Sequence, residues 1–398
     1  MRVRGRVVTP TGVLDDGLVV VSGRRIEYVG RAAAFRPGDG GDHAAAQVHA
    51  PARGFVLPGL VDIHNHGGGG GAFTADRAGL DRAARHHLGH GSTSVIAGVV
   101  TDSPEAMLAA VATAADAVDD GSLSGIHLEG PFLSRRCRGA QDPRHLRTPD
   151  TGLAHDLLAA GRGHVRAMTL APELPRAEDV VGLLLEDGVV PAVGHTEADA
   201  GLVRRTLASA RAELGRPGLV THLFNGMPQL HHRDPGPVAG ALGAAAAGDA
   251  LVELIADGVH LDDETVRMVL ELLGHERVVL VTDAMAAAGM PDGSYDLGPQ
   301  RVAVTRGVAR LGEGGQAPLA GGTSHLLDVV RRCVHAGIDL AAAVAAASST
   351  PARALALDDQ VGSLQPGRSA DLLLVSDDLE LVRVMRAGEW VSARGRAH

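Results

Sequence analysis

The 398-residue chain contains no lysine, so all 37 of its strongly basic side chains are arginines. The absence of lysine excludes a phosphate-binding loop of the Gly-Lys-Ser/Thr type, a Schiff-base lysine, and a carboxylated lysine that bridges two metal ions. The glycine run Gly67–Gly71 is therefore not a phosphate loop of that kind. We expect it to make a sharp turn and to leave room for a substrate close to the backbone.

Cysteine and aromatic residues are also scarce. The two cysteines, Cys137 and Cys333, do not make a disulfide framework, which predicts a protein of the reducing cytoplasm. Phe, Tyr and Trp together make up 2% of the residues, so the core must be aliphatic. The first residues, Met1 to Gly5, lead into no signal-peptide core, and apolar runs such as 340–347 are too short to span a bilayer.

The net charge of −10 comes without any cluster of basic residues. A protein that binds nucleic acid or an anionic membrane needs a basic surface that attracts phosphate groups. The sequence therefore predicts that neither nucleic acid nor a membrane is a partner.

The two ends of the chain differ from its middle in the secondary structure that their sequence predicts. Residues 1–54 and 358–398 contain short strand-like segments between Gly, Pro and Asp turns, and because chain ends often lie close together we predict that they form one small β-sandwich domain. Residues 55–357 alternate strands with amphipathic or Ala-rich segments. The predicted strands of this middle part are Gly59–His64, Ser94–Val99, Gly125–Leu128, Arg166–Leu170, Val189–Val193, Leu219–Leu223, Val252–Ala256 and Val278–Thr282.

Eight strand–helix units in series predict an α/β fold, a (β/α)₈ TIM-like barrel, with a doubly wound sheet as the structural alternative. The clearest predicted helix is Asp262–Leu273, where apolar residues recur at helical spacing behind an acidic N-cap signal. Residues 294–319 instead show hairpin-like strands with Gly and Pro turns. We interpret them as an insertion after the eighth strand, followed by helices at about 323–337 and 339–348.

Two histidines stand at the end of the first predicted barrel strand. Residues two apart on a strand share a face, so His64 and His66 are expected to point the same way. Two imidazoles side by side suggest a divalent metal site. A polar strand end without a ligand is the alternative interpretation of this pair alone.

Polar residues collect at the same end of the other predicted strands. In a barrel of this kind the carboxyl ends of the strands carry the active site. Any one of these side chains could be an ordinary hydrogen-bonded loop residue, but six strands that each deliver a His, Glu or Asp to one rim indicate a shared site. The residues at these strand ends are His64, His66, Glu129, His195, His222, His260 and Asp283.

Several segments resemble the N-acetylglucosamine-6-phosphate deacetylases of the amidohydrolase superfamily over essentially the full chain. The Glu-Gly-Pro-Phe segment at Glu129 and the His-Leu-Phe-Asn segment at His222 are particular to that family, whereas the segments at 350–353 and 362–372 are widespread among amidohydrolases. The remaining matches are Gly59–His66, Gly194–Thr196, Ala256–His260, Val281–Ala284 and Leu319–Thr323.

The resemblance implies a divalent metal held by Glu129, His195 and His222, with a water completing its shell. Because this chain keeps both His64 and His66, those two could hold a second metal with Glu129 as the bridging ligand. One or two metals per subunit are therefore expected. Zinc is the first choice for a His/carboxylate site with an open position, and Fe, Mn or Co are possible ions.

The chemistry of the strand ends agrees with hydrolysis of an amide. A metal in such a site lowers the pKa of its bound water to about 7. Asp283 is predicted to act as the general base toward that water and then to return the proton to the departing amine. His260 is predicted to donate a hydrogen bond to the carbonyl oxygen as charge develops there.

Without lysine, phosphate must be bound in another way. The resemblance implies that Asn225 and Gly226 bind the phosphate together with Arg233 from the neighbouring subunit of a homodimer, and arginine suits bidentate phosphate binding. The further predicted substrate contacts are Gln141, Ala140, His260 and Leu319.

These residues lead to one functional expectation and two alternatives. The expectation is hydrolysis of N-acetylglucosamine 6-phosphate to glucosamine 6-phosphate and acetate by an amidohydrolase that acts on a linear amide (EC 3.5.1.25-like). An enzyme for the galactosamine epimer needs the same catalytic residues and differs at one hydroxyl. A non-catalytic scaffold with the same fold is the alternative from another class, and such a protein would be expected to have lost metal ligands.

Overall fold

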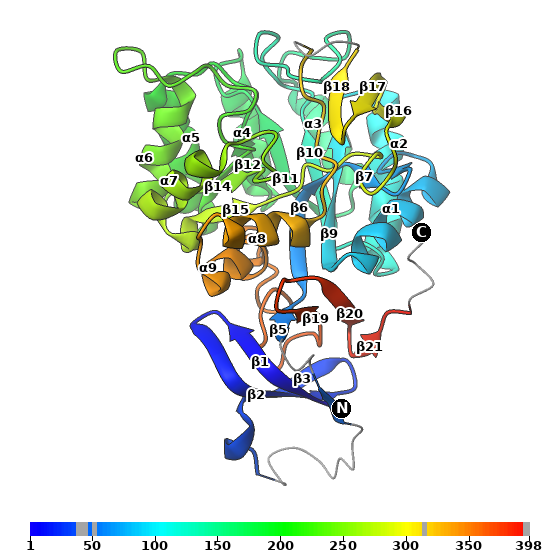
Figure 1. The fold of residues 1–398 in the computed structure, drawn as a ribbon. Coiled ribbons are helices and arrows are strands. Elements are labelled where there is room, and N and C mark those ends of the chain that lie inside the picture. The colour runs from blue at the N-terminus through cyan, green and yellow to red at the C-terminus, as the bar shows by residue number, and fades with distance from the viewer. Residues whose placement is uncertain (37–46, 50–53, 313–316, 393–398) are drawn as a thin grey trace.

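The computed structural model describes residues 1–36, 47–49, 54–312 and 317–392. Figure 1 shows a large α/β part and a smaller β part that contains strands from both ends of the chain. None of the helices in these ranges is both long and apolar enough to cross a bilayer.

Eight parallel strands form the barrel, each hydrogen-bonded to the next along the chain. The barrel closes where the segment after the last strand pairs with the first: the Asp283 amide donates to the His64 carbonyl at 2.9 Å, and the His66 amide donates to the Ala284 carbonyl at 2.7 Å. This closure confirms the predicted barrel and rules out the doubly wound alternative. The strands are β6 (Leu60–Asn65), β9 (Ser92–Val100), β10 (Gly125–Glu129), β11 (Val165–Leu170), β12 (Val190–Val193), β13 (Gly218–Val220), β14 (Ala250–Leu254) and β15 (Val278–Leu280).

Aliphatic side chains fill the inside of the barrel. Val61 and Ile63 of β6 are fully buried and pack with apolar residues from the other strands, while Leu355 packs below them beside α10. An aliphatic core of this kind fits the scarcity of aromatic residues.

Helices cover the outside of the barrel (Figure 1). The predicted helix at 262–273 is present as α7: the Asp262 carboxylate caps it by accepting from the Glu264 amide, and Val266, Val269 and Leu270 face the core. The helices are α1 (Arg77–Gly89), α2 (Pro104–Asp119), α3 (Thr151–Ala160), α4 (Ala177–Glu186), α5 (Ala200–Leu214), α6 (Gly236–Ala247), α7 (Asp263–Leu273), α8 (Leu326–His335), α9 (Leu340–Ala346) and α10 (Ser349–Ala354), with short 3₁₀ turns at η1 (Ala32–Ala34) and η2 (His275–Arg277).

The two ends of the chain together form a separate sheet domain. The prediction was a β-sandwich, whereas the strands described at the two ends belong to one sheet. Its strands are connected into a single eight-stranded sheet in which β5 pairs with β1 on one side and with β19 on the other. The predicted boundary between residues 54 and 55 falls at the start of β5. The strands are β1 (Arg2–Thr9), β2 (Gly12–Ser22), β3 (Arg25–Arg31), β4 (Gln47–His49), β5 (Gly54–Pro58), β19 (Leu372–Ser376), β20 (Leu381–Arg386) and β21 (Glu389–Trp390).

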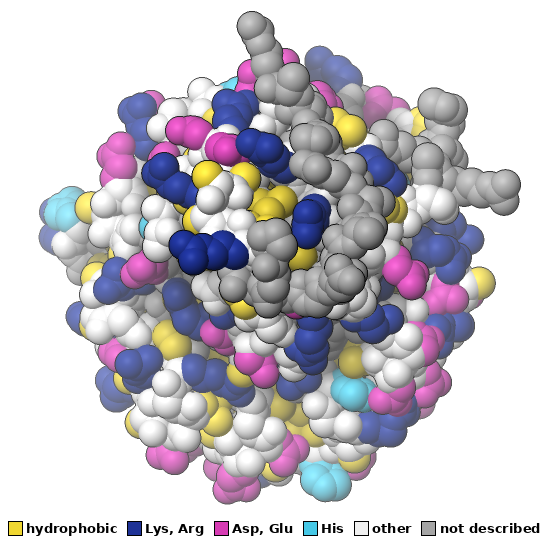
Figure 2. Space-filling view, turned by 90° about the horizontal axis from the view of Figure 1, so that it is seen from below, with side chains coloured by type: hydrophobic (Ala, Val, Ile, Leu, Met, Phe, Trp, Pro, Cys, Tyr) yellow, Lys and Arg dark blue, Asp and Glu magenta, His cyan; other side chains and the backbone are white. Residues whose placement is uncertain are grey.

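The surface at this end of the molecule carries charges of both signs. Figure 2 shows arginine and acidic side chains next to each other on this face. Arg4 and Asp16, for example, form an exposed ion pair at 2.7 Å, of the kind that contributes at most about 1 kcal/mol to stability.

The predicted insertion after the eighth strand is a three-stranded antiparallel sheet made of β16 (Gly293–Leu297), β17 (Gln300–Thr305) and β18 (Val308–Leu311). Leu297 and Val302 of this sheet pack against Met285 and Ala320 of the barrel rim. The insertion therefore forms part of the wall above the carboxyl ends of the strands (Figure 1).

The glycine run follows β6 and makes a tight hairpin through β7 (Gly67–Gly68) and β8 (Gly71–Ala72). A Cβ at Gly68 would lie 2.5 Å from His87 Nε2, and one at Gly71 would lie 2.1 Å from the Gly79 carbonyl of α1. The expectation that these glycines leave room for a substrate is therefore wrong, because they leave room for α1 to pack against the hairpin.

Candidate metal centre

Predicted strand-end side chains meet around Glu129, the last residue of β10. One carboxylate oxygen, Oε1, lies 2.9 Å from Nε2 of His195 and 3.1 Å from Nε2 of His222. The other, Oε2, lies 3.3 Å from Nε2 of His66. Glu129 thus faces histidines with both of its oxygens.

The first strand and the eighth complete the cluster. Nε2 of His64 lies 3.2 Å from Nε2 of His66. Asp283 Oδ1 lies 3.0 Å from His66 Nε2 and 3.6 Å from His64 Nε2. The structure therefore brings all five predicted metal ligands and the predicted base together, and each is at most 8% exposed.

Three of these residues have a backbone that L-amino acids seldom adopt. The φ angles are +48° at His195, +29° at His222 and +47° at Asp283. A non-glycine residue with such an angle costs about 1–2 kcal/mol and persists only where the surrounding structure enforces it. All three come just after barrel strands, where the turn directs their side chains toward Glu129.

Partners on the outer side of the rings fix the histidine tautomers. Nδ1 of His64 lies 2.8 Å from Oε2 of Glu253, and Nδ1 of His66 lies 2.9 Å from the Gly98 carbonyl. Nδ1 of His195 lies 2.8 Å from the Cys137 carbonyl, in the loop after β10. An Nδ1–H that donates outward leaves the lone pair of a neutral imidazole on Nε2. These lone pairs point into the cluster.

Acceptor atoms therefore face one another at the centre. Nε2 atoms are 3.2 Å apart in the His64–His66 pair and 3.1 Å apart in the His195–His222 pair, with carboxylate oxygens between them. Lone pairs at such distances repel unless a cation lies between them. Imidazole and carboxylate donors are the ligands that Zn²⁺ and other first-row divalent ions prefer, so the donor set fits a divalent metal.

The charge state of the cluster supports the same conclusion. Burial would raise the pKa of Asp283, but the hydrogen bond from His66 and the charge of His64 outweigh it and lower the pKa to about 2. Burial would lower the pKa of His64, but the charge of Glu253 outweighs it and raises the pKa to about 10. Hydrogen bonds from two imidazoles likewise hold the pKa of Glu129 well below its usual range despite burial. Without a metal, the ionised carboxylates therefore draw protons onto the histidines, and a divalent cation would take the place of those protons.

A cavity of about 270 Å³ opens above these residues. It is large enough for a small polar ligand. The predicted substrate residues Asn225, Gly226, Gln141, Ala140, Leu319 and His260 all line it, together with Glu129, His195, His222, His66 and Asp283.

Two of the residues that line the cavity, His260 and Gln141, are oriented by hydrogen bonds to carboxylates. His260 is held by Asp257, whose Oδ2 lies 2.8 Å from its Nδ1. That contact leaves Nε2 available toward the cavity. Gln141 donates from Nε2 to Glu129 Oε2 at 2.5 Å, so it orients the central carboxylate in addition to lining the cavity.

Arg233 lies elsewhere. It is an exposed residue that hydrogen-bonds to its neighbour His232, and it does not line the cavity of its own subunit. The structure thus separates it from the other predicted substrate residues.

Sequence reasoning did not identify Glu253 or the supporting role of His127. Glu253 is fully buried in the middle of β14 and also accepts from the His222 amide at 3.1 Å. His127 is buried beside His64 and hydrogen-bonds through Nε2 to Thr169 at 2.7 Å. A single acidic residue inside the apolar strand 250–254 was the signal for Glu253, because a buried carboxylate needs a partner.

The Amidohydrolase family model matches residues 55–391, which is most of the chain. The chain belongs to the amidohydrolase family. A curated relative of this amidohydrolase, the N-acetylglucosamine-6-phosphate deacetylase of Bacillus subtilis, is 32% identical over 96% of this chain and 94% of its own length. The N-acetylgalactosamine-6-phosphate deacetylase of Escherichia coli is 34% identical over 85% of this chain and 88% of its own length.

One solved structure has the same fold as this chain over almost its whole length. It is a variant of the N-acetyl-D-glucosamine-6-phosphate deacetylase of Mycobacterium smegmatis in complex with N-acetyl-D-glucosamine-6-phosphate, with a TM-score of 0.88, 39% sequence identity, and 98% of each chain covered. The resemblance stated from the sequence motifs is therefore confirmed. The family typically binds a divalent metal, and in this amidohydrolase the candidate ligands are assembled at the rim of the barrel.

Proposed function

We propose that this amidohydrolase hydrolyses N-acetylglucosamine 6-phosphate to glucosamine 6-phosphate and acetate. The observation that carries the proposal is one cavity lined by Glu129, His195 and His222 together with Asp283 and His260. Similarity to the Bacillus subtilis and Mycobacterium smegmatis deacetylases over nearly the full chain supports the choice of substrate.

The five ligand candidates suit one or two Zn²⁺ ions. Glu129, His195 and His222 would hold the first, while His64 and His66 would hold a second, with Glu129 as the bridge. Its two carboxylate oxygens already face these two groups of histidines. A bound divalent ion would polarise the amide carbonyl and bring the pKa of a water down to about 7.

Two side chains of the cavity would transfer the proton and stabilise the negative charge that develops on the carbonyl oxygen. Asp283, whose pKa of about 2 keeps it ionised at neutral pH, accepts a proton from the attacking water and then delivers it to the amine nitrogen as the C–N bond breaks. His260, held by Asp257, donates a hydrogen bond to the carbonyl oxygen as it becomes negative. The products are an acetate and a free amine.

The sugar phosphate would be bound by the loop after β13 and by a second subunit. Asn225 and Gly226 line the cavity. Arg233 is exposed and lies outside the cavity of its own chain, so we propose that it reaches the phosphate bound by the partner of a homodimer. Arginine binds phosphate oxygens bidentately.

The galacto epimer is the second candidate substrate, because the Escherichia coli relative named for it has a sequence identity of 34%, close to the 32% of the Bacillus subtilis relative named for the gluco compound. Steady-state kinetics on the two epimers decide between them. We expect a higher kcat/KM for N-acetylglucosamine 6-phosphate, and a clear preference for the galactosamine compound would overturn the proposed substrate. The scaffold alternative is disfavoured because the side chains of all five predicted ligands lie close to one another around Glu129.

A further inference from the structure

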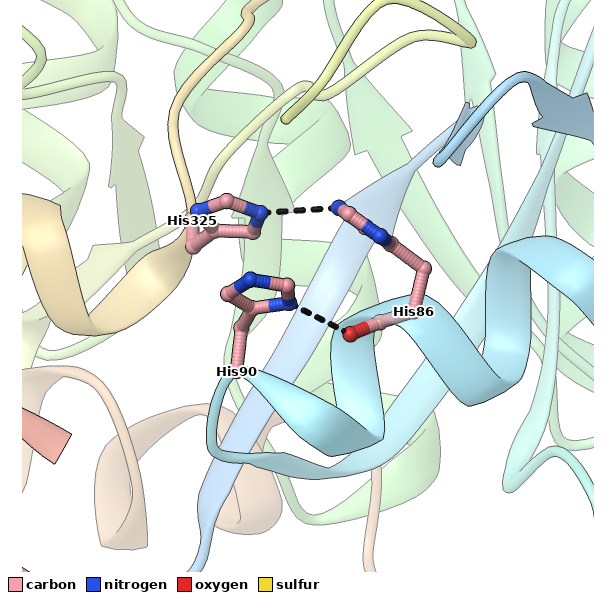
Figure 3. A group of neighbouring side chains, drawn as sticks. All are labelled: His86, His90 and His325. Atoms are coloured by element: carbon pink, nitrogen blue, oxygen red, sulfur yellow. Dashed lines mark hydrogen bonds between the residues drawn. The ribbon is translucent and has the colours of Figure 1, made fainter. Parts of the chain in front are cut away.

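Three histidines outside the catalytic cavity come together between two helices. His86 lies in the last turn of α1, His90 is the C-cap residue after that helix, and His325 is the residue immediately before α8. Figure 3 shows the three rings directed toward one another from these two segments. None of them lines the catalytic cavity, and all three are half-buried, so water and small ions can reach them.

The distances between these rings suit a shared ion. One ring nitrogen from each histidine lies within 4.8 Å of the others. Nε2 of His86 is 2.9 Å from Nε2 of His325, and the His90 and His325 rings are stacked with centroids 3.7 Å apart. Two nitrogens bound to one tetrahedral Zn²⁺ at 2.0–2.1 Å are about 3.3 Å apart, so His86 needs only a small outward shift. His90 must also turn out of its stack on His325, because a metal lies in the plane of each imidazole that binds it.

The outer hydrogen bonds prepare two of the rings as ligands. Asp328 Oδ2 lies 3.0 Å from Nδ1 of His325 and also accepts from the His325 amide at 3.3 Å. His90 Nδ1 donates to the carbonyl of His86 at 2.7 Å. A histidine that donates from Nδ1 to a carboxylate or a carbonyl is the usual form of a metal-ligating histidine, because it carries its lone pair on Nε2.

We propose that His86, His90 and His325 form a separate site for a divalent first-row ion with a preference for imidazole, such as Zn²⁺, with water in the remaining coordination position. His86 and His90 have the i, i+4 spacing that zinc sites on helices use, and although His90 lies just past the end of α1 the two ring centroids are 4.4 Å apart. This site is independent of the proposed deacetylase activity.

One hydrogen bond joins His86 to His325 in the absence of an ion. Because Nδ1 of His325 donates to Asp328, its Nε2 carries the lone pair, and Nε2–H of His86 is the donor to it. A divalent ion replaces that proton and binds both nitrogens, whereas a cluster that is held by stacking alone keeps the single hydrogen bond.

The ion would join segments that lie behind the catalytic cavity. The His86 ring packs between two glycines, since a Cβ at Gly69 would lie 2.8 Å from it and a Cβ at Gly289 would lie 2.5 Å from it. Gly69 belongs to the hairpin that follows His66, and its amide donates to the Ala288 carbonyl at 2.9 Å. Ion binding would therefore stabilise the packing of α1 and α8 against this hairpin and the segment after β15.

The test compares metal binding by the wild-type protein and by variants that keep the fold. His325→Asn retains a good N-cap residue for α8, and His90→Gln retains a donor for the His86 carbonyl. His335→Ala is the matched control, because it removes an exposed histidine from the last turn of the same helix. Each protein, loaded at its catalytic centre, is equilibrated with ZnCl₂ and desalted, and its zinc content and melting temperature are measured.

We expect the wild type and the His335→Ala protein to retain one more equivalent of zinc than the His325→Asn and His90→Gln proteins. We also expect zinc to raise the melting temperature of the first pair more than that of the second pair, because a ligand that binds only the folded state stabilises it. Deacetylase activity should be the same in all four proteins. Equal zinc content in all four would overturn the proposal, whether or not the chain is a deacetylase.

Discussion

His64 and Glu253 form a fully buried pair in which imidazole Nδ1 lies 2.8 Å from carboxylate Oε2. The contact directs Nε2 of His64 toward the candidate metal centre around Glu129, and the same carboxylate oxygen accepts from the amide of His222. One residue of β14 therefore orients two candidate ligands that come from different strands.

Substitution of Glu253 tests this support. Glu253→Gln keeps the size of the side chain and removes its charge, so we expect metal affinity to fall by about 10–100-fold. The dissociation constant can be measured by competition with a chelator. Glu271→Gln, an exposed residue of α7, is the control and should leave the affinity unchanged. Equal affinities in the two variants would show that Glu253 does not position the ligands.

Asp283→Asn tests the proposed proton transfer. The amide is neutral and cannot accept the proton of the attacking water, so kcat should fall by about 100-fold or more. Metal content should stay at the wild-type level, because the five proposed ligands are intact. Retained turnover in a variant with full metal content would remove Asp283 from the mechanism.

Arg233→Ala tests phosphate binding by the partner subunit. We expect a higher KM for the phosphorylated sugar with little change in melting temperature, because Arg233 is exposed. The control is Arg211→Ala, an exposed arginine on α5. Mixed dimers with Asp283→Asn subunits should regain activity, since one of their sites combines an intact Asp283 with an intact Arg233 from the partner. Absence of such complementation in verified mixed dimers would contradict action in trans.

The sequence was sufficient to predict the barrel and the residues that meet at its rim, and the reason is physical. Periodicity specifies the strands, the carboxyl ends of parallel strands meet at one rim, and alternation places His64 and His66 on one face. Glu253 was missed because its role depends on closure of the barrel, which brings β14 near β6 although the two strands are not paired. A single acidic residue within an apolar strand carries no information about its partner.

Other features depended on packing between segments that are distant in the chain. The glycine run was interpreted as space for a substrate, yet the space is filled by α1, because close approach of a helix and close approach of a ligand both need glycine. His86 and His90 show their helical spacing in the sequence, but His325 is 239 residues from His86. Only the packing of α8 beside α1 brings the three rings together.

His87 gives a prediction for stability in acid. Burial lowers its pKa to about 3, with a smaller opposing contribution from its hydrogen bond to the Gly67 carbonyl. The pKa of histidine in an unfolded chain is near 6.5, so the unfolded chain binds one more proton between these values. The stabilisation is therefore complete above pH 6.5 and is lost as the pH falls toward 3, at about 1.4 kcal/mol per pH unit.

Urea unfolding between pH 6 and pH 4 in chelator-treated buffer measures how the free energy of unfolding falls with pH. We expect His87→Gln to reduce the slope of unfolding free energy against pH by about one proton. His155→Gln, at an exposed position on α3, should keep the wild-type slope. The same slope in the His87 variant as in the wild type would show that His87 is protonated in the folded protein.

The central claim is that this amidohydrolase uses the metal centre around Glu129 to release acetate from N-acetylglucosamine 6-phosphate. The most direct measurement follows acetate and free amine with the zinc-loaded protein, after removal of the metal by a chelator, and after zinc is restored. We expect equal amounts of acetate and glucosamine 6-phosphate from the loaded protein, loss of both products on metal removal, and recovery with zinc. No acetate from the fully loaded protein, or undiminished release from verified metal-free protein, would contradict this claim.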